Sequence, residues 1–252
     1  MPKAYLIDMD GVLVHGRRPI PGAAEFIRRL RDASAPFLIL TNNSRHTPAD
    51  HAAQLQEVGI PVDPGNIFTS AIATARFVAH QRPGASVYAI GEIGLLAALQ
   101  AEDLVLSQRD PDYVVLGETV TYSFEQITTA TRLVQAGARF IGTNPDTSGP
   151  AEHGIVPATG AVAALISAAS GVRAYFVGKP NPLMMRAALT EIGAHAKDAV
   201  MVGDRMDTDI VAGTETGMDT ILVLSGVTRR EEVGSFAYLP THIVGSVAEI
   251  VP

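Results

Sequence analysis

The sequence contains no cysteine. Disulfide bonds, zinc–thiolate sites and thiol nucleophiles are therefore excluded. It also contains no long hydrophobic run, since the longest weakly polar stretch, residues 158–172, is too short to span a bilayer. The first residues pass directly into an apolar segment, without the basic and apolar leader that is typical of a signal peptide. These absences predict a cytoplasmic protein that has no membrane as a partner.

An excess of basic residues is also missing. The 252 residues include 19 Lys and Arg against 26 Asp and Glu, which gives a formal net charge of −7. Because a nucleic-acid-binding surface needs a basic patch or stripe, we expect no nucleic-acid polymer as a partner. A small anionic substrate stays compatible with this charge, because a few local cations can outweigh the field of the whole chain. The length and the hydrophobic content of 47% suit one large α/β domain, or a core domain with an insertion.

Several common catalytic signatures are absent as well. No Gly-x-Gly-x-x-Gly follows a predicted strand, and no Gly-x-Ser-x-Gly elbow occurs. Gly178 and Lys179 are followed by Pro180 rather than by Ser or Thr, which argues against a phosphate-binding Walker A loop. The seven histidines show no metal-ligand spacing such as His-Glu-x-x-His. These patterns argue against a P-loop nucleotide-binding protein, a serine esterase of the α/β-hydrolase type and a histidine-based zinc site.

What the sequence does contain is a regular alternation of short apolar runs and amphipathic segments. The apolar runs predict strands at 4–7, 36–40, 66–70, 86–91, 113–117, 139–144, 175–179, 199–204 and 220–224. The amphipathic segments predict helices at 21–31, 48–58, 93–102, 124–135, 161–169, 183–192 and 209–216. This alternation predicts an α/β fold with a largely parallel, doubly wound sheet.

Polar residues follow four strands that we assign to the core of this fold. They are Asp8 and Asp10, Thr41 and Asn42, Lys179, and Asp204. Each has an ordinary alternative explanation as a turn residue, a helix cap or a solvated lysine. Because the carboxyl ends of parallel strands share one edge of a sheet, we expect these side chains to lie together.

Such a group of residues suits phosphoryl transfer. Asp8 and Asp204 offer the hard oxygen ligands that Mg²⁺ prefers, and Asp8 can attack phosphorus to give an aspartyl-phosphate. Residues 41–42 can donate hydrogen bonds to the transferring oxygens, and Lys179 can neutralise the charge that develops there. Asp10 can protonate the leaving alkoxide and then activate the water that cleaves the intermediate.

Four segments, in order, resemble the motifs of the phosphatases of the haloacid dehalogenase superfamily. They are Asp-Met-Asp-Gly-Val-Leu at 8–13, Thr-Asn-Asn at 41–43, Gly-Lys-Pro at 178–180 and Gly-Asp-Arg-Met-Asp-Thr-Asp at 203–209. The long insert between the second and third segments lies where class II members carry an α/β cap. Within it, Gly-Thr-Asn-Pro-Asp at 142–146 is similar to the NagD-type subfamily, class IIA. The resemblance covers essentially the whole chain.

This resemblance implies a Rossmann-like three-layer core with a parallel sheet and an inserted class II cap. The core would comprise residues 1–77 and 176–252, and the cap, which sets substrate specificity, residues 78–175.

The resemblance also implies a role for each motif residue. Asp8 would be the nucleophile and Asp10 the general acid and base. Mg²⁺ would be held by Asp8, the backbone carbonyl of Asp10, and Asp204. Asp209 would orient metal-bound water or Lys179.

The phosphoryl group and the leaving group would have separate binding residues. Thr41, Asn42 and Lys179 would hold the phosphoryl group. Asn144 and Asp146, in the cap, would contact the leaving group, although a proline-containing turn capped by Asx side chains is an equally good explanation for these two residues. His15 stands where an aromatic residue is common in relatives, and it has no assigned role.

The substrate expected from the resemblance is a small-molecule phosphate ester, foremost a nucleoside monophosphate such as UMP. Sugar phosphates, phosphoglycolate and aryl phosphates remain open, because fold and core motifs do not set the substrate. Two functions of another class also remain: a phosphotransferase or mutase with the same core motifs, and a non-catalytic binding protein. Whether the chain forms a homo-oligomer, the physiological substrate and the hinge positions of the cap are open too.

Overall fold

The computed structural model describes residues 3–151 and 154–252, and it divides the chain into two compact units. The first unit comprises residues 1–41, 48–68 and 179–252, and the second comprises 42–47 and 69–178. These units differ from the predicted domain ranges chiefly at 42–47 and 69–77, which lie in the second unit. The assignment of the predicted ranges as catalytic core and cap remains a prediction.

The first unit is built on a six-stranded sheet with the strand order β15-β14-β13-β1-β4-β5. Its strands are β1 (Ala4–Asp8), β4 (Phe37–Thr41), β5 (Ile67–Thr69), β13 (Ala199–Gly203), β14 (Asp219–Val223) and β15 (His242–Val244). Parallel pairs join β1 to β13 and β4, and join β14 to β13 and β15. The two strands at the centre of these pairings, β1 and β13, are buried along their whole length, as expected for apolar runs covered on both faces.

Helices cover both faces of this sheet. On one face, α1 (Ala23–Asp32) and α2 (Pro48–Glu57) share a hydrophobic cluster with Tyr5, Ile7, Val200 and Val202. Met201 alternates with Val200 and Val202, so its side chain points to the opposite face. Gly213 of α8 (Val211–Thr216) lies so close to Met201 that a larger residue at 213 would overlap it. Helix α8 therefore covers the opposite face, where it packs with α7 (Pro182–Glu191).

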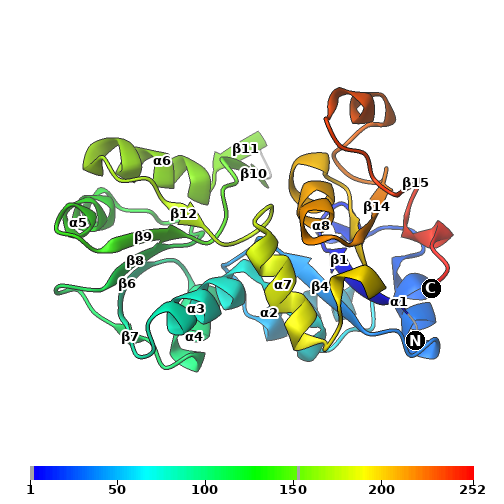
Figure 1. Ribbon diagram of the computed structural model, residues 1–252, viewed down its shortest axis with the longest axis horizontal. Helices are drawn as coiled ribbons and strands as arrows, with labels where there is room; N and C mark the ends of the chain where they lie inside the picture. The colour runs from blue at the N-terminus through cyan, green and yellow to red at the C-terminus, as the bar shows by residue number, and fades with distance from the viewer. Residues whose placement is uncertain (1–2, 152–153) are drawn as a thin grey trace. The chain divides into compact units, whose positions relative to one another are not determined.

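The second unit has its own five-stranded sheet, with the strand order β12-β9-β8-β6-β7 and parallel pairs throughout. Its strands are β6 (Ser86–Ile90), β7 (Val105–Leu106), β8 (Tyr113–Leu116), β9 (Arg139–Gly142) and β12 (Tyr175–Phe176). Its helices are α3 (Ser70–Gln81), α4 (Ile93–Ala101), α5 (Phe124–Gln135) and α6 (Thr159–Ser170). Figure 1 shows α3 and α4 on one face of this sheet and α5 and α6 on the other. Together the two sheets confirm the predicted α/β class.

The strand at 175–179 corrects one expectation. It was expected in the same sheet as the strand that carries Asp8, but β12 pairs with β9 in the second unit, with Tyr175 opposite Ile141. Lys179 therefore does not follow a strand of the first sheet. It lies at the return of the chain into the first unit, three residues before α7. The sequence could not separate these cases, because a short apolar run carries no information about which strand it pairs with.

Other differences are local. Helix α3 was not predicted, because its buried residues are mostly small and its sequence has no clear apolar stripe; it begins where the Thr69 hydroxyl accepts a hydrogen bond from Ile72 N. Two hairpins were not predicted either, β2 (Val14–His15) with β3 (Arg18–Pro19) and β10 (Ser148–Ala151) with β11 (Gly154–Pro157). The helix expected at 209–216 begins as a π-helical turn over Met206–Ile210.

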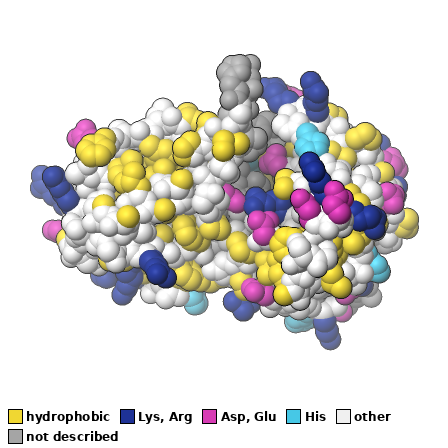
Figure 2. Space-filling view, turned by 90° about the horizontal axis from the view of Figure 1, so that it is seen from above, with side chains coloured by type: hydrophobic (Ala, Val, Ile, Leu, Met, Phe, Trp, Pro, Cys, Tyr) yellow, Lys and Arg dark blue, Asp and Glu magenta, His cyan; other side chains and the backbone are white. Residues whose placement is uncertain are grey.

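The remaining short helices are 3-10 turns at Pro64–Asn66, Ala196–Asp198, Arg230–Ser235 and Val247–Glu249. None of the helices described is long and apolar enough to cross a membrane. In the face that Figure 2 shows, Asp and Glu side chains gather over the first unit, on the right, whereas apolar and uncharged atoms dominate the second.

Candidate active site

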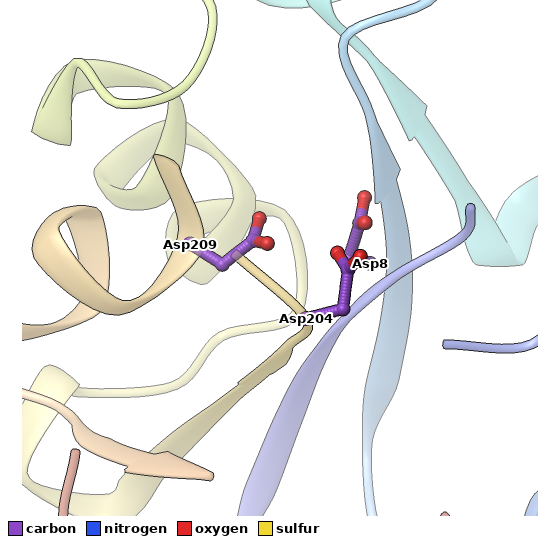
Figure 3. A group of neighbouring side chains, drawn as sticks. All are labelled: Asp8, Asp204 and Asp209. Atoms are coloured by element: carbon purple, nitrogen blue, oxygen red, sulfur yellow. The ribbon is translucent and has the colours of Figure 1, made fainter. Parts of the chain in front are cut away.

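Three aspartates of the first unit bring their carboxylates together (Figure 3). Asp8 is the last residue of β1, and Asp204 directly follows the neighbouring strand β13. The pairing of Ile7 with Val202 sets these two strand ends side by side, as expected for parallel neighbours. Asp209 enters from the π-helical turn that precedes α8. One oxygen atom from each of the three carboxylates lies within 4.8 Å of the others.

Lys179 joins two of these carboxylates. Its Nζ donates hydrogen bonds to Asp8 Oδ1 at 2.5 Å and to Asp209 Oδ1 at 2.7 Å, and its side chain is only 4% exposed. The second oxygen of Asp209, Oδ2, accepts a hydrogen bond from Arg205 N at 3.2 Å. A side chain at Gly203 would overlap Asp209, so the strand end must approach the turn closely. Asp209 is thereby fixed as a partner of Lys179, which suits its expected orienting role.

Asp204 is held by the loop that follows β14. Its Oδ2 accepts a hydrogen bond from Val227 N at 2.7 Å, and a side chain at Gly226 or at Gly11 would overlap this carboxylate. Gly11 also has a φ of +81°, which favours glycine. Neither Val227 nor Gly226 had a role predicted from the sequence. Only the position of a Ser-Gly-Val segment just after a strand could have pointed to them.

Burial and repulsion between neighbouring carboxylates disfavour the ionised forms of Asp8 and Asp204. Burial raises the pKa of Asp204 to about 6, and repulsion from Asp209 adds to this effect, while Val227 N–H and Lys179 oppose it. Burial also raises the pKa of Asp8 well above its ordinary value, with Lys179 opposing. Burial lowers the pKa of Lys179, but the carboxylates of Asp209 and Asp8 outweigh this and raise it overall. Three buried carboxylates thus lie around one buried ammonium group, which bonds to two of them.

This arrangement fits a divalent cation. Three carboxylates against one ammonium group leave an excess of negative charge that a divalent ion would neutralise. Asp204 Oδ1 is buried and accepts no hydrogen bond, so one ligand oxygen is unsatisfied within the described residues. A donor set made only of oxygen suits hard cations such as Mg²⁺.

Asp10 lies close to Asp8 along the chain, and Thr41 lies close to Asp8 on the neighbouring strand of the sheet. Asp10 follows β1 by two residues and forms a bridge with Val14, so the chain turns sharply there. Its side chain reaches the surface, but nearby protein atoms still desolvate the carboxylate and raise its pKa, with Lys179 and His15 opposing. Thr41 is the buried last residue of β4, next to the point where that strand pairs with Asp8.

Three further predicted residues gather in the second unit rather than the first. Asn42 Nδ2 donates to Asp146 Oδ2 at 2.9 Å, and Asn144 Nδ2 donates to Asn42 O at 2.8 Å. Ser70 Oγ donates to the same carbonyl at 2.6 Å. Asp146 N donates to Asn144 Oδ1 at 3.1 Å, so the alternative of an Asx-capped turn is present in the geometry as well. Contact of Asn144 and Asp146 with substrate stays a prediction.

The sequence matches two family models, that of the haloacid dehalogenase-like hydrolases over residues 5–105 and that of the HAD-like hydrolases over residues 176–250. A dihydroxyacetone phosphatase of Corynebacterium glutamicum (strain R) is 51% identical over 98% of this chain and 90% of its own length. An acid sugar phosphatase of Staphylococcus saprophyticus is 42% identical over 99% of this chain and 96% of its own.

A third relative has a solved structure. The ribonucleotide monophosphatase NagD of Escherichia coli K-12 is 42% identical over 98% of both chains. Its structure matches with a TM-score of 0.94 over 99% of this chain and 98% of that one. The chain belongs to the haloacid dehalogenase-like hydrolase family. Within that family it is a NagD-type phosphatase of class IIA, which confirms the resemblance inferred from the motifs.

Proposed function

We propose that this phosphatase hydrolyses small phosphate monoesters in two steps, with the phosphoryl group carried by Asp8 between them. The observation that carries the proposal is the position of Lys179 Nζ, which bonds to both Asp8 and Asp209 beside Asp204. A buried carboxylate with a fixed cation beside it can attack a phosphoryl group whose negative charge that cation offsets.

In the first step, a carboxylate oxygen of Asp8 forms a bond to phosphorus as the bond to the ester oxygen breaks. Lys179 bonds to Oδ1 of Asp8, and we assign the attack on phosphorus to Oδ2. Asp10 gives a proton to the departing alkoxide, and the raised pKa of Asp10 favours its protonated form at the start of this step. The products are an alcohol and an acyl phosphate on Asp8.

In the second step, the ionised Asp10 takes a proton from a water molecule as the water oxygen bonds to phosphorus. The bond from phosphorus to Asp8 breaks, and inorganic phosphate leaves. Thr41, Asn42 and Lys179 would bind the phosphoryl oxygens through both steps.

Mg²⁺ is the cation that we assign to the site. Asp8, Asp204 and the carbonyl of Asp10 would hold it, with Asp209 keeping Lys179 in place. When bound, Mg²⁺ supplies positive charge that offsets the buried carboxylates and the phosphoryl oxygens.

Three substrate classes are compatible with the relatives. The resemblance to NagD-type phosphatases favours nucleoside monophosphates such as UMP, and the 42% identical ribonucleotide monophosphatase supports them. The 51% identical dihydroxyacetone phosphatase favours a phosphorylated three-carbon ketose instead. The 42% identical acid sugar phosphatase supports sugar phosphates as a third class.

Phosphate release from a panel of nucleoside monophosphates, sugar phosphates, dihydroxyacetone phosphate, phosphoglycolate and aryl phosphates tests both parts of the proposal. Each ester is measured with Mg²⁺ and with EDTA. Metal-dependent release of inorganic phosphate supports the reaction, and the ranking of kcat/KM selects the substrate class. Transfer of the phosphoryl group to a sugar hydroxyl, with no phosphate released to water, would refute hydrolysis in favour of a phosphotransferase.

A further inference from the structure

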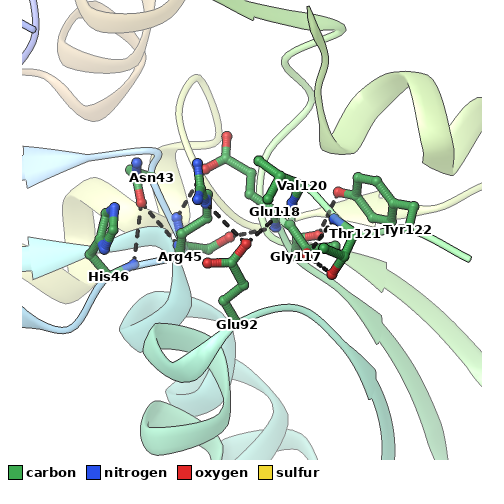
Figure 4. Close-up of polar contacts among 11 residues, drawn as sticks. Asn43, Arg45, His46, Glu92, Gly117, Glu118, Val120, Thr121 and Tyr122 are labelled. Carbon is green, nitrogen blue, oxygen red and sulfur yellow. Dashed lines mark hydrogen bonds and ion pairs between the residues drawn. The ribbon is translucent and has the colours of Figure 1, made fainter. Parts of the chain in front are cut away.

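The short segment 42–47 is anchored inside the second unit by two glutamates (Figure 4). Glu92 Oε1 accepts a hydrogen bond from Arg45 Nε at 3.2 Å and another from Val120 N at 3.2 Å. Glu118 Oε2 accepts a hydrogen bond from Ser44 N at 3.3 Å. The segment begins with Asn42, so these carboxylates control the backbone next to a predicted phosphate-binding residue.

Glu118 makes hydrogen bonds to the turn that carries Asn144 as well as to the segment 42–47. Its own backbone N–H donates to Ser44 Oγ at 2.8 Å, which makes the contact with Ser44 reciprocal. Its Oε1 accepts a hydrogen bond from Asn144 Nδ2 at 3.4 Å, and the same amide group of Asn144 donates to Asn42 O. Ser44 is fully buried and also accepts from Thr143 Oγ1 at 3.1 Å. One carboxylate therefore joins the loop that carries Asn42 to the turn that carries Asn144 and Asp146.

We propose that Glu118 is a positioning residue that fixes the Asn42–Ser44 loop against the Asn144–Asp146 turn and thereby sets selectivity among phosphate esters. The inference rests on the proposed substrate contacts of Asn42, Asn144 and Asp146. The positioning role of Glu118 requires its carboxylate to be ionised. An ionised carboxylate accepts hydrogen bonds at both oxygens, whereas a protonated acid or an amide presents a donor to one of the two N–H groups.

The groups around Glu118 determine when it is ionised. Burial raises the pKa of Glu118 to about 7, with repulsion from Asp146 adding to this, while Ser44 N–H, Asn144 Nδ2–H and Arg45 oppose it. Tyr122 is neutral near pH 7, and its hydroxyl donates to Gly117 O at 2.7 Å. Glu118 therefore changes charge near neutral pH, and the fixed geometry should be lost as the pH falls below about 7.

Glu92 provides a matched control. It holds the same segment but is less buried than Glu118, and hydrogen bonds from Val120 N and Arg45 overcome the effect of burial and lower its pKa. Glu92 therefore stays ionised over the whole range in which Glu118 titrates. A variant at Glu92 tests loosening of the loop without removing the group that titrates near pH 7.

The kinetic test measures kcat/KM for UMP and for dihydroxyacetone phosphate, each divided by kcat/KM for acetyl phosphate, from about pH 5.5 to about pH 8.5. The division cancels limbs from Asp8 and Asp204, which act on every substrate. Any limb from Asp10, which matters more for alkoxide leaving groups than for acetate, is kept in Glu118→Gln and is separated by that comparison. In the wild-type protein, the ratio for the preferred ester should rise with pH, with a midpoint near 7. In Glu118→Gln the ratio should be about tenfold lower at pH 8 and should show no such step. Glu92→Gln should keep the step.

A second readout does not depend on the substrate. The backbone N–H signal of Ser44 in a ¹⁵N-resolved NMR spectrum should shift with pH in the wild-type protein, with a midpoint near 7, and should not do so in Glu118→Gln. The proposal is overturned if the Ser44 signal does not titrate near this pH, or if Glu118→Gln keeps the wild-type ratio and step. If Asn144→Ala and Asp146→Ala leave the ratio unchanged, the proposed substrate contacts fail instead, while the Ser44 signal still decides the positioning role.

Discussion

The two units each concentrate buried polar groups at the ends of parallel strands, but they use different chemistry. In the first unit, Asp8, Asp204, Asp209 and Lys179 form a cluster of formal charges in which a single ammonium group serves two carboxylates. In the second unit, the contacts around Asn42 run mainly through amides, hydroxyls and backbone groups. The difference suits two tasks: bond cleavage needs concentrated charge, whereas recognition needs donors and acceptors in fixed directions.

The largest expected effect is the loss of phosphate release when the nucleophile in the first unit is replaced. Asp8→Asn removes the nucleophile but keeps the shape of the side chain, so phosphate release should fall by about a thousandfold or more on every ester. Thermal unfolding should stay close to that of the wild-type protein. Asp32→Asn, at an exposed residue of α1 in the same unit, should keep full activity. Appreciable turnover by Asp8→Asn would show that another group attacks phosphorus.

Asp10→Asn should slow both chemical steps, because one residue supplies the proton and later accepts one. We expect a loss of about 10²–10⁴-fold, with less effect on esters whose leaving groups are already good, such as 4-nitrophenyl phosphate. Rapid-quench measurement of protein-bound phosphate should detect slower decay of the phosphorylated form. Equal decay in variant and wild type would remove Asp10 as the base.

Lys179→Met tests how much the charged cluster depends on its cation. The substitution leaves Asp8 and Asp209 buried without their shared partner, which should lower the free energy of unfolding by about 3–5 kcal/mol. Lys197→Met, at an exposed lysine, should change it by less than about 0.5 kcal/mol. Urea unfolding in EDTA and in Mg²⁺ measures both variants. A Lys179→Met protein as stable as Lys197→Met would mean that the carboxylates are protonated in the native state.

Substitutions in the second unit should change the selectivity among phosphorylated substrates. Asn144→Ala and Asp146→Ala should change the ranking of UMP, dihydroxyacetone phosphate and larger sugar phosphates by about tenfold, with a smaller effect on acetyl phosphate. Steady-state kinetics on these substrates measures this. Equal losses on all of them would favour the turn explanation, in which these side chains only cap the backbone.

The smallest effect is a dependence of stability on pH. The folded-state pKa of Asp204 is about 6, above the ordinary value of 3.8, so the folded protein takes up a proton that the unfolded chain does not. In EDTA, lowering the pH from about 7.5 to about 5 should therefore raise the contribution of this group to stability by about 1 kcal/mol.

The control for this effect is Asp204→Asn, in which the rise should be smaller by the same amount. Mg²⁺ should reverse the trend, since it binds the ionised carboxylates and is displaced by protons. A rise that is unchanged in Asp204→Asn would assign the effect to other acids, Glu118 among them.

Much of this site could be predicted from the sequence, because its signals are local. The pair Asp8 and Asp10 follows an apolar run, and Asp204 follows another, so their positions at strand ends needed no knowledge of the fold. Most helices and strands were predicted within a few residues for the same reason. The parallel α/β class followed from the alternation of the two kinds of segment.

The rest depended on pairings between distant segments. The strand before Lys179 joins the sheet of the second unit, and the backbone carbonyl of Asn42 accepts hydrogen bonds from Asn144 and Ser70, which also belong to that unit. Glu118 gave no signal at all, because a lone glutamate after a strand resembles any solvated residue. Its importance comes from Ser44, which lies 74 positions earlier in the chain.

The sequence by itself determined which segments become helices and strands, that the fold is α/β, and that aspartates stand at the ends of buried strands. These properties follow from hydrophobic periodicity and from the residues that end each run. Only the tertiary structure decided that Lys179 meets Asp8 across 171 positions, that Asp204 Oδ1 accepts no hydrogen bond from the residues described, and that burial raises the pKa of Glu118 to about 7. The physical reason is that strand order and burial, which fix distances and desolvation, are set by packing across the whole chain.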